Sequence, residues 1–138
     1  VIEYNCRMGD PETEIVLPRL KNDLVDLLIA VGNGTLDTKT IEIDKRAAAT
    51  VIVASGGYPE DYEKGKEITG LEDADDAIVF HAGTKADGDK IVTNGGRVLA
   101  VTSYGKTIQD AVAASNKAIG NIYFPGKYYR KDIGYEFK

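Results

Sequence analysis

The sequence predicts an α+β fold, in which short helices precede a small, mostly antiparallel β-sheet that carries a packed helix. Three observations support this prediction. Helix-start residues and leucines at helical spacing occur between residues 10 and 34. Short β-prone runs separated by glycine and aspartate follow, and one amphipathic stripe begins after Thr107. The change of pattern predicts two domains, residues 1–35 and residues 36–138.

The chain opens with an alternating stretch, VIEYNCRM, which predicts a β-strand. Side chains of a strand alternate between its faces, so one face carries Glu3, Asn5 and Arg7. The other face is apolar and carries Ile2, Tyr4, Cys6 and Met8. Residue 1 lies inside this predicted strand, and neither an initiating methionine nor a signal peptide precedes it. We therefore expect a fragment whose upstream part is missing.

Two short helical segments are expected after this strand. The pair Asp10-Pro11 is a favourable helix start, because aspartate caps free amides and proline suits the first helical position. Pro18 predicts a kink or break, since it removes a backbone hydrogen bond. A second helix is expected to begin near Asn22 or Asp23 and to end at the glycines that follow Val31.

The β-prone runs are the evidence for the sheet. They span residues 41–43, 47–55, 77–83, 90–94 and 97–103. Asp87-Gly88 and Asn94-Gly95-Gly96 separate the later runs, and both are typical of the turns in antiparallel hairpins. Gly56-Gly57-Tyr58-Pro59 is expected to be a turn that ends a strand.

A longer helix is predicted to cover this sheet. Thr107 is its expected N-cap, and the residues that form its apolar stripe recur at helical spacing. They are Ile108, Val112, Ser115, Ile119 and Ile122. The aromatic tail that follows, YFPGKYYRKDIGYEF, is expected to pack back on the body of the protein.

Composition excludes several classes of function. The 138 residues carry a net charge of −5, from 17 basic and 22 acidic side chains, and no run of lysine or arginine suits a phosphate backbone. Nucleic acid is therefore not an expected partner. No apolar run approaches the roughly 20 residues of a membrane span. The only cysteine, Cys6, cannot form an internal disulfide, so we expect a cytoplasmic protein that does not bind membranes.

The polar face of the opening strand is the first candidate site. Glu3 and Asn5 are two positions apart, which brings their oxygens close enough to bind one cation. Mg²⁺ prefers such hard oxygen ligands and shares them with water and phosphate. Arg7 continues the row and suits phosphate or carboxylate oxygens. The alternative is an ordinary solvent-facing side of an amphipathic strand.

Several motifs resemble a known family. The string EYNCR resembles the E-x-N-x-R strand near the end of the ATP-grasp domain, and IEYNCRMGDPETEIVLPRL is similar to the phosphoribosylamine-glycine ligase family of purine biosynthesis. Further stretches resemble the C-terminal region of this family, in the same order along the chain. They are GGYPEDYEKGKEITGL, VFHAGTKADG, VTNGGRVLAVTSYG and YYRKDIG.

The resemblance implies a reaction and its ligands. ATP phosphorylates the carboxylate of glycine, and the amine of 5-phosphoribosylamine then attacks the glycyl phosphate, releasing phosphate and leaving ADP. Glu3 and Asn5 would bind Mg²⁺ or Mn²⁺, and Arg7 would be the catalytic residue that stabilises negative charge. Residues 1–35 would end the ATP-grasp domain, and 36–138 would form the C-terminal α+β domain. The ATP-binding lobes would precede residue 1, so the fragment alone is expected to be inactive.

Two glycine-containing turns are further candidates for substrate binding. Gly9 and Asp10 would direct backbone amides toward an anionic group, or would simply form a turn and cap. Gly95, Gly96 and Arg97 would hold a substrate carboxylate or phosphate, or would form a tight turn with a solvated arginine.

Two alternative functions remain open at this point. The chain could belong to another ATP-grasp ligase that joins a carboxylate to an amine. It could also be a non-catalytic binding or assembly module whose polar strand face contacts a protein.

Overall fold

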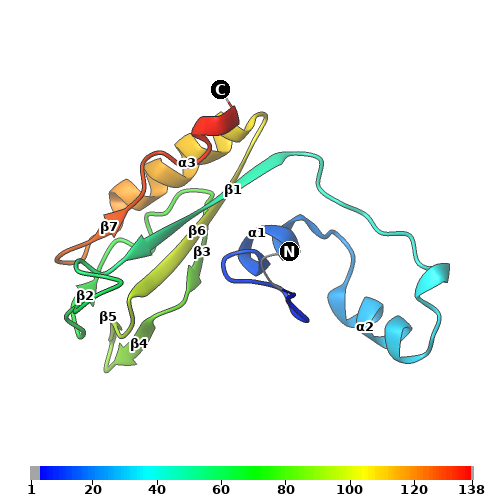
Figure 1. Cartoon of the computed structure of the whole chain (residues 1–138), viewed down its shortest axis with the longest axis horizontal. Coiled ribbons are helices and arrows are strands. Elements are labelled where there is room, and N and C mark those ends of the chain that lie inside the picture. Colours follow the sequence, from blue (N-terminus) through cyan, green and yellow to red (C-terminus); the bar gives the residue numbers. More distant parts are fainter. Residues whose placement is uncertain (1–3, 138) are drawn as a thin grey trace. The chain divides into compact units, whose positions relative to one another are not determined.

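The computed structural model describes residues 4–137 and divides the chain into two compact units, Val1–Arg46 and Ala47–Lys138 (Figure 1). Helices and antiparallel sheets are both present, so the predicted α+β class is confirmed. Among the described residues, none of the helices has the length and apolar character of a membrane span. Each unit is described in turn.

The first unit begins without the predicted strand. Residues 4–9 are irregular, with a bend at Cys6 and Arg7, and Tyr4 is 90% exposed. The prediction of a strand is therefore wrong for residues 4–8, and residues 1–3 lie outside the described part. A strand needs a hydrogen-bonded neighbour, and none of the strands between residues 4 and 137 pairs with this segment.

The first helices begin later than predicted and break where predicted. Helix α1 spans Thr13–Val16, with Glu12 and not Asp10 at its N-cap. Residues 10–12 form a turn instead, closed where the Gly9 carbonyl accepts the backbone N–H of Thr13 at 3.0 Å. The prediction for Pro18 is confirmed, because α1 gives way to the 3-10 helix η1, Leu17–Arg19.

Helix α2, Leu24–Gly32, confirms the second helical prediction. Its N-cap is Asp23, whose carboxylate accepts the backbone N–H groups of Val25 at 2.8 Å and Asp26 at 3.2 Å. Gly34 follows the helix with a φ of +66°, a conformation that glycine adopts readily. The short 3-10 helix η2, Leu36–Thr38, comes next.

Residues 41–43 were predicted to be β-prone but form only an isolated bridge, Leu20 to Ile43, so a full strand there is wrong. The side chain of Asn22 explains why the ladder stops. Its amide oxygen accepts the Glu42 backbone N–H at 2.6 Å, and its NH₂ group donates to the Thr40 carbonyl at 2.9 Å. These bonds replace the backbone pairs that would extend a sheet.

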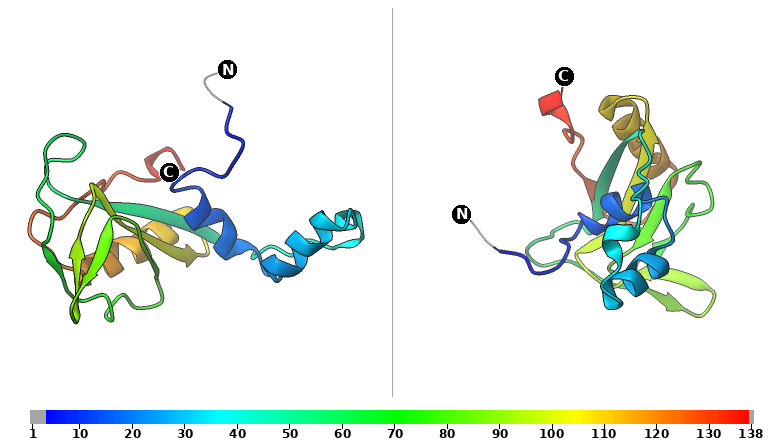
Figure 2. Two further views of the ribbon diagram at one scale, coloured as in Figure 1. Left: turned by 90° about the horizontal axis from the view of Figure 1, so that it is seen from below. Right: turned by 90° about the vertical axis from the view of Figure 1, so that its right-hand side faces the viewer.

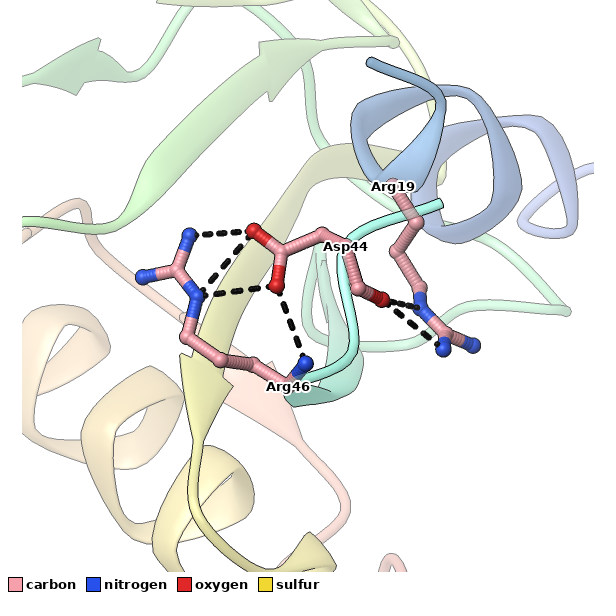
Figure 3. A network of polar contacts seen from close by, with 3 residues as sticks. All are labelled: Arg19, Asp44 and Arg46. Atoms are coloured by element: carbon pink, nitrogen blue, oxygen red, sulfur yellow. Dashed lines mark hydrogen bonds and ion pairs between the residues drawn. The ribbon is translucent and has the colours of Figure 1, made fainter. Parts of the chain in front are cut away.

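Two arginines hold the end of this paired segment (Figure 3). The Asp44 carbonyl accepts Nε and Nη2 of Arg19 at 3.3 and 3.1 Å. The Asp44 carboxylate accepts Nη2 of Arg46 at 2.7 Å and the Arg46 backbone N–H at 2.9 Å. These hydrogen bonds from Arg46 lower the pKa of Asp44 to about 2.

The second unit contains two antiparallel sheets where one was expected. The larger has the order β3-β6-β1-β7, and the smaller has the order β2-β5-β4. The strands are β1 (Ala47–Ala54), β2 (Glu67–Ile68), β3 (Ile78–His81), β4 (Thr84–Asp87), β5 (Lys90–Thr93), β6 (Arg97–Gly105) and β7 (Tyr128–Tyr129). Gly88 lies at the tip of the β4-β5 hairpin, as its sequence predicts.

The hairpin predicted at Asn94-Gly95-Gly96 is wrong. These residues form a turn, but it joins β5 of the smaller sheet to β6 of the larger. Strand β5 already pairs with β2 on one edge and with β4 on the other, so neither edge is left for β6. The turn therefore carries the chain from one sheet to the next.

Helix α3, Ile108–Asn121, packs against strands β1 and β6 (Figures 1 and 2). Its start is confirmed, because Thr107 and Asp110 form a reciprocal capping box. Ala111, Ser115, Ala118 and Ile119 are the buried helix residues, so two alanines join the predicted stripe. The core between helix and sheet includes Val51, Val53, Leu99, Val101, Ile119 and Ile122.

The tail packs back partly as expected. Phe124 is 1% exposed and belongs to the core, while Tyr128 and Phe137 are mostly exposed. Lys127 closes the end of α3, where its ammonium donates to the carbonyls of Ile119 at 2.7 Å and Ile122 at 2.5 Å. Partial burial lowers the pKa of this lysine.

Candidate functional site

The first group of candidate residues lies at the start of the chain. Glu3 is outside the described residues. Asn5 and Arg7 are both exposed, and a bend at Cys6 and Arg7 separates them, so they do not share the face of a regular strand here. Nη1 of Arg7 donates to the carbonyl of Met8 at 3.2 Å.

The donor chemistry of Asn5 suits a hard cation. Its amide oxygen is of the type that Mg²⁺ accepts together with water and phosphate oxygens. Within residues 4–137, no group of three or more histidine, cysteine, aspartate or glutamate side chains gathers in a metal-binding arrangement. Magnesium binding by Glu3 and Asn5 stays a prediction.

Gly9 and Asp10 form the turn before α1. The backbone N–H of Gly9 donates to Oε2 of Glu12 at 3.0 Å, so this amide already has an anionic partner. A Cβ on Gly9 would lie 2.7 Å from the same oxygen, which makes glycine necessary while Glu12 keeps this position. For this amide to bind a substrate anion, Glu12 would have to move. Substrate binding by Gly9 and Asp10 stays a prediction.

The second group of candidates gathers at one end of the larger sheet. The antiparallel register pairs the last residue of β1, Ala54, with the first of β6, Arg97, and pairs the last residue of β3, His81, with Leu99. The segments that leave β1 and β3 and the segment that enters β6 must therefore lie together. We call these three segments, residues 55–59, 81–84 and 94–97, the loop cluster.

Hydrogen bonds tie the loop cluster together. Ser55 donates its backbone N–H to the Gly96 carbonyl at 2.8 Å and its Oγ to the Gly95 carbonyl at 3.0 Å. Gly83 donates to the Arg97 carbonyl at 2.8 Å and accepts the Asn94 N–H at 2.7 Å. Three segments that are separate in the sequence therefore form one structure.

His81 belongs to the same cluster. Its Nδ1 lies 3.0 Å from Oγ1 of Thr84, and both residues are at the turn that leaves β3. The histidine is exposed, with its ring engaged by a neighbour on its own turn. This local hydrogen bond fits a structural role for His81.

A pocket that the sequence did not indicate lies beside the first segment of the cluster. Its volume is about 390 Å³. The lining residues are Ser55, Gly56, Asp61, Tyr62, Glu63, Lys66, Pro125 and Gly126. Lys66 and Glu63 form an ion pair at 2.5 Å, and the hydrogen bond from Lys66 lowers the pKa of Glu63. The loops that form this pocket have no common local signal.

Comparison with known proteins now defines the class. Residues 48–136 match the family model described as phosphoribosylglycinamide synthetase, C domain. The match covers nearly all of the second unit, Ala47–Lys138. The chain belongs to the phosphoribosylglycinamide synthetase family, whose similar members are named phosphoribosylamine-glycine ligase.

The relatives resemble nearly the whole chain. The ligase of Chlorobaculum tepidum is 50% identical over 137 residues, covering 97% of this chain and 32% of its own length. The ligase of Salmonella typhimurium is 49% identical, covering 98% and 32%. A bifunctional purine biosynthetic protein of Dictyostelium discoideum is 49% identical, covering 97% and 17%.

A solved structure agrees with the fold. The crystal structure of phosphoribosylamine-glycine ligase from Thermotoga maritima superposes with a TM-score of 0.75 at 34% identity, covering 96% of this chain and 32% of that one. The chain thus spans about a third of the length of the ligases that it matches. The resemblance to the ligase family predicted from the sequence motifs is confirmed.

Proposed function

We propose that this chain is the C-terminal third of a phosphoribosylamine-glycine ligase of purine biosynthesis. The observation that supports this most directly is the 50% identity to the Chlorobaculum tepidum ligase over 97% of the chain. The complete enzyme would join glycine to 5-phosphoribosylamine, converting ATP to ADP and phosphate through glycyl phosphate. We expect it to work in the cytoplasm.

The chemistry requires charge neutralisation and positioning more than proton transfer. A magnesium or manganese ion would neutralise the phosphates of ATP and support transfer of the phosphoryl group. Glu3 and Asn5 would supply a carboxylate and an amide oxygen to this ion. Arg7 would pair with the negative charge of the acyl phosphate or of the phosphate that leaves it.

The loop cluster would take part from the second unit. Arg97, at the start of β6, would bind an anionic group of a substrate, and Gly95 and Gly96 would shape the turn that carries it. Residues 1–35 would complete an ATP-grasp domain whose nucleotide-binding lobes belong to the remaining two thirds of the enzyme. The chain of 138 residues is therefore expected to have no ligase activity alone.

The test is a coupled assay of ADP release by the full-length ligase with Mg-ATP, glycine and fresh phosphoribosylamine. Glu3→Ala and Asn5→Ala should each lower kcat by about 100-fold or more and raise the magnesium concentration required, because a phosphate-bridging ion loses a ligand. Asn33→Ala is the matched control, since Asn33 is an exposed residue at the end of α2.

Two outcomes would contradict the proposal. Normal turnover of Glu3→Ala at limiting magnesium would remove the metal assignment. A full-length protein that hydrolyses ATP only with a different amine or carboxylate would remove the ligase assignment. Activity that requires all three substrates, together with silence from the 138-residue chain, would support both assignments.

A further inference from the structure

The turn that carries Arg97 is held from three sides. On the first side, Ser55 donates both its backbone N–H and its hydroxyl to the carbonyls of Gly96 and Gly95, at 2.8 and 3.0 Å. Ser55 is 5% exposed, so these hydrogen bonds are shielded from water. A buried carbonyl that loses such a donor is costly to leave unsatisfied. The Ser55 contacts therefore restrict the turn strongly.

An aromatic ring covers the second side. A Cβ added to Gly96 would lie 2.0 Å from Cδ2 and 2.5 Å from Cε2 of Tyr58, closer than any real contact. Gly96 itself is buried. The ring is held in turn, because the Tyr58 N–H donates to the Ser55 carbonyl at 3.1 Å and its ring meets Tyr62 edge-on at 6.1 Å. Glycine is thus the only residue type at position 96 that leaves room for the Tyr58 ring.

Backbone from the β3-β4 segment forms the third side. Gly83 exchanges hydrogen bonds with Arg97 and Asn94, and a Cβ on Gly83 would lie 2.7 Å from the Cα of Gly95. The two glycines are therefore in direct backbone contact. Strand β6 is also irregular at this point, since Ala54 pairs with Arg97 while Val53 pairs with Leu99, which leaves Val98 as an extra residue. Such bulges redirect a neighbouring side chain.

We propose that Ser55 and Tyr58 are positioning residues that hold Arg97 in place to bind an oxyanion of the substrate. This inference rests on the proposed function. Arg97 is half-buried at the first position of β6, where the chain beside it is restricted on every side named above. A turn whose backbone is already restricted loses little further freedom when its arginine binds a phosphate or carboxylate, so binding is stronger than on a mobile loop.

The oxyanion has two sources, the phosphate of phosphoribosylamine and the carboxylate of glycine. The assay separates them, because a change in KM for one substrate alone identifies which group Arg97 binds. Arg97→Ala in the full-length ligase should raise that KM by at least about tenfold, with smaller changes for the other substrates.

Ser55→Ala should raise the same KM by about three- to tenfold, because the turn becomes mobile while Arg97 remains. Ser115→Ala is the matched control, since Ser115 is also a buried serine that donates to a backbone carbonyl, that of Ala49 at 3.1 Å. It should lower the melting temperature to a similar degree and leave every KM unchanged. Tyr58→Ala should behave like Ser55→Ala, and Tyr58→Phe, which keeps the ring over Gly96, should restore the normal KM.

A double-mutant cycle separates positioning from general destabilisation. In the Arg97→Ala background, Ser55→Ala should add less than about a twofold change, because the residue that it positions is gone. Multiplicative effects of the two substitutions would overturn the inference, as would an unchanged KM in Arg97→Ala or an equal KM change in Ser115→Ala. Those results leave the ligase assignment intact. Absence of ligase activity in the unmodified full-length protein would overturn both the ligase assignment and the positioning roles of Ser55 and Tyr58.

Discussion

The two units differ in how much of their apolar surface they bury. In Ala47–Lys138, a continuous core includes Val51, Leu99 and Ile119, each fully buried. In Val1–Arg46, helix α2 buries only Leu27 and Ala30, while Leu28 is 60% exposed. A unit with its own core meets the usual criterion of an independent domain. The comparison teaches that the second unit stabilises itself, whereas α2 obtains little stability from packing within its own unit.

Substitution of one leucine in each unit gives the largest expected contrast. Leu99→Ala should lower the free energy of unfolding by about 2–5 kcal/mol, because it opens a cavity in the core. Leu28→Ala should change it by less than about 0.5 kcal/mol, because the side chain is mostly exposed. Urea denaturation of the 138-residue chain, followed by far-ultraviolet circular dichroism, measures both. Equal losses would show that α2 contributes to a core after all.

Removing one helix cap in each unit tests the same contrast between the units, with an expected loss of stability of about 1 kcal/mol. Thr107→Ala removes the capping box of α3 and should destabilise the second unit by about that amount. Asp23→Ala removes the cap of α2 and should affect only the first unit. Amide hydrogen exchange can report on each helix separately. Faster exchange in α3 after Asp23→Ala would mean that the two units unfold together.

The ion pairs of the two units should give the smallest effects. The pKa of Asp44 is about 2, below its ordinary value of 3.8, because of hydrogen bonds from Arg46. A lowered pKa means that the contribution of this group to stability is present above about pH 4 and is lost as the pH falls toward 2. The Arg46 side chain is 59% exposed and that of Asp44 is 21% exposed, so water still screens the pair and the change in stability should be slight.

Carboxyl titration by nuclear magnetic resonance checks this prediction. Arg46→Gln should return the pKa of Asp44 toward 3.8. Arg130→Gln is the counterpart in the second unit, where a hydrogen bond from Arg130 lowers the pKa of Asp132. It should raise the pKa of Asp132 and leave that of Asp44 unchanged. An Asp44 that titrates at 3.8 in the unmodified chain would contradict the geometry in Figure 3.

Local signals predicted much of the fold. Pro18, Asp23 and Thr107 act on the backbone within one helical turn, and each has the predicted effect. The longer strands β1 and β6 were also recognised, since they have eight and nine residues and each contains a β-prone run. In contrast, β2 and β7 have two residues each, too few to show a pattern, and form because a partner strand is nearby. The predicted opening strand is wrong over residues 4–8 for the opposite reason, because the pattern is present but none of the described strands pairs with this segment.

The candidate site was only partly predictable for a similar reason. Turn residues at 94–97 and 56–59 were found from their glycines, and both turns lie in stretches that resemble the family, but only Gly95, Gly96 and Arg97 were predicted to bind substrate. The contacts that join them depend on distant parts of the chain, since Ser55 and Gly95 are 40 positions apart. The ring of Tyr58 over Gly96 likewise follows from tertiary packing. Sequence patterns identify a turn, but they do not show which other turn it will meet.

The extra residue of β6, Val98, also limits where the chain can gain or lose residues. Deleting Val98 would remove the bulge and shift the register that places Gly95 and Gly96 against Gly83 and Tyr58. An insertion there would also shift this register. The tip of the β4-β5 hairpin is different, since a Cβ on Gly88 would meet no atom within 4 Å. Natural or engineered insertions should therefore accumulate at Gly88 and be absent from residues 94–98.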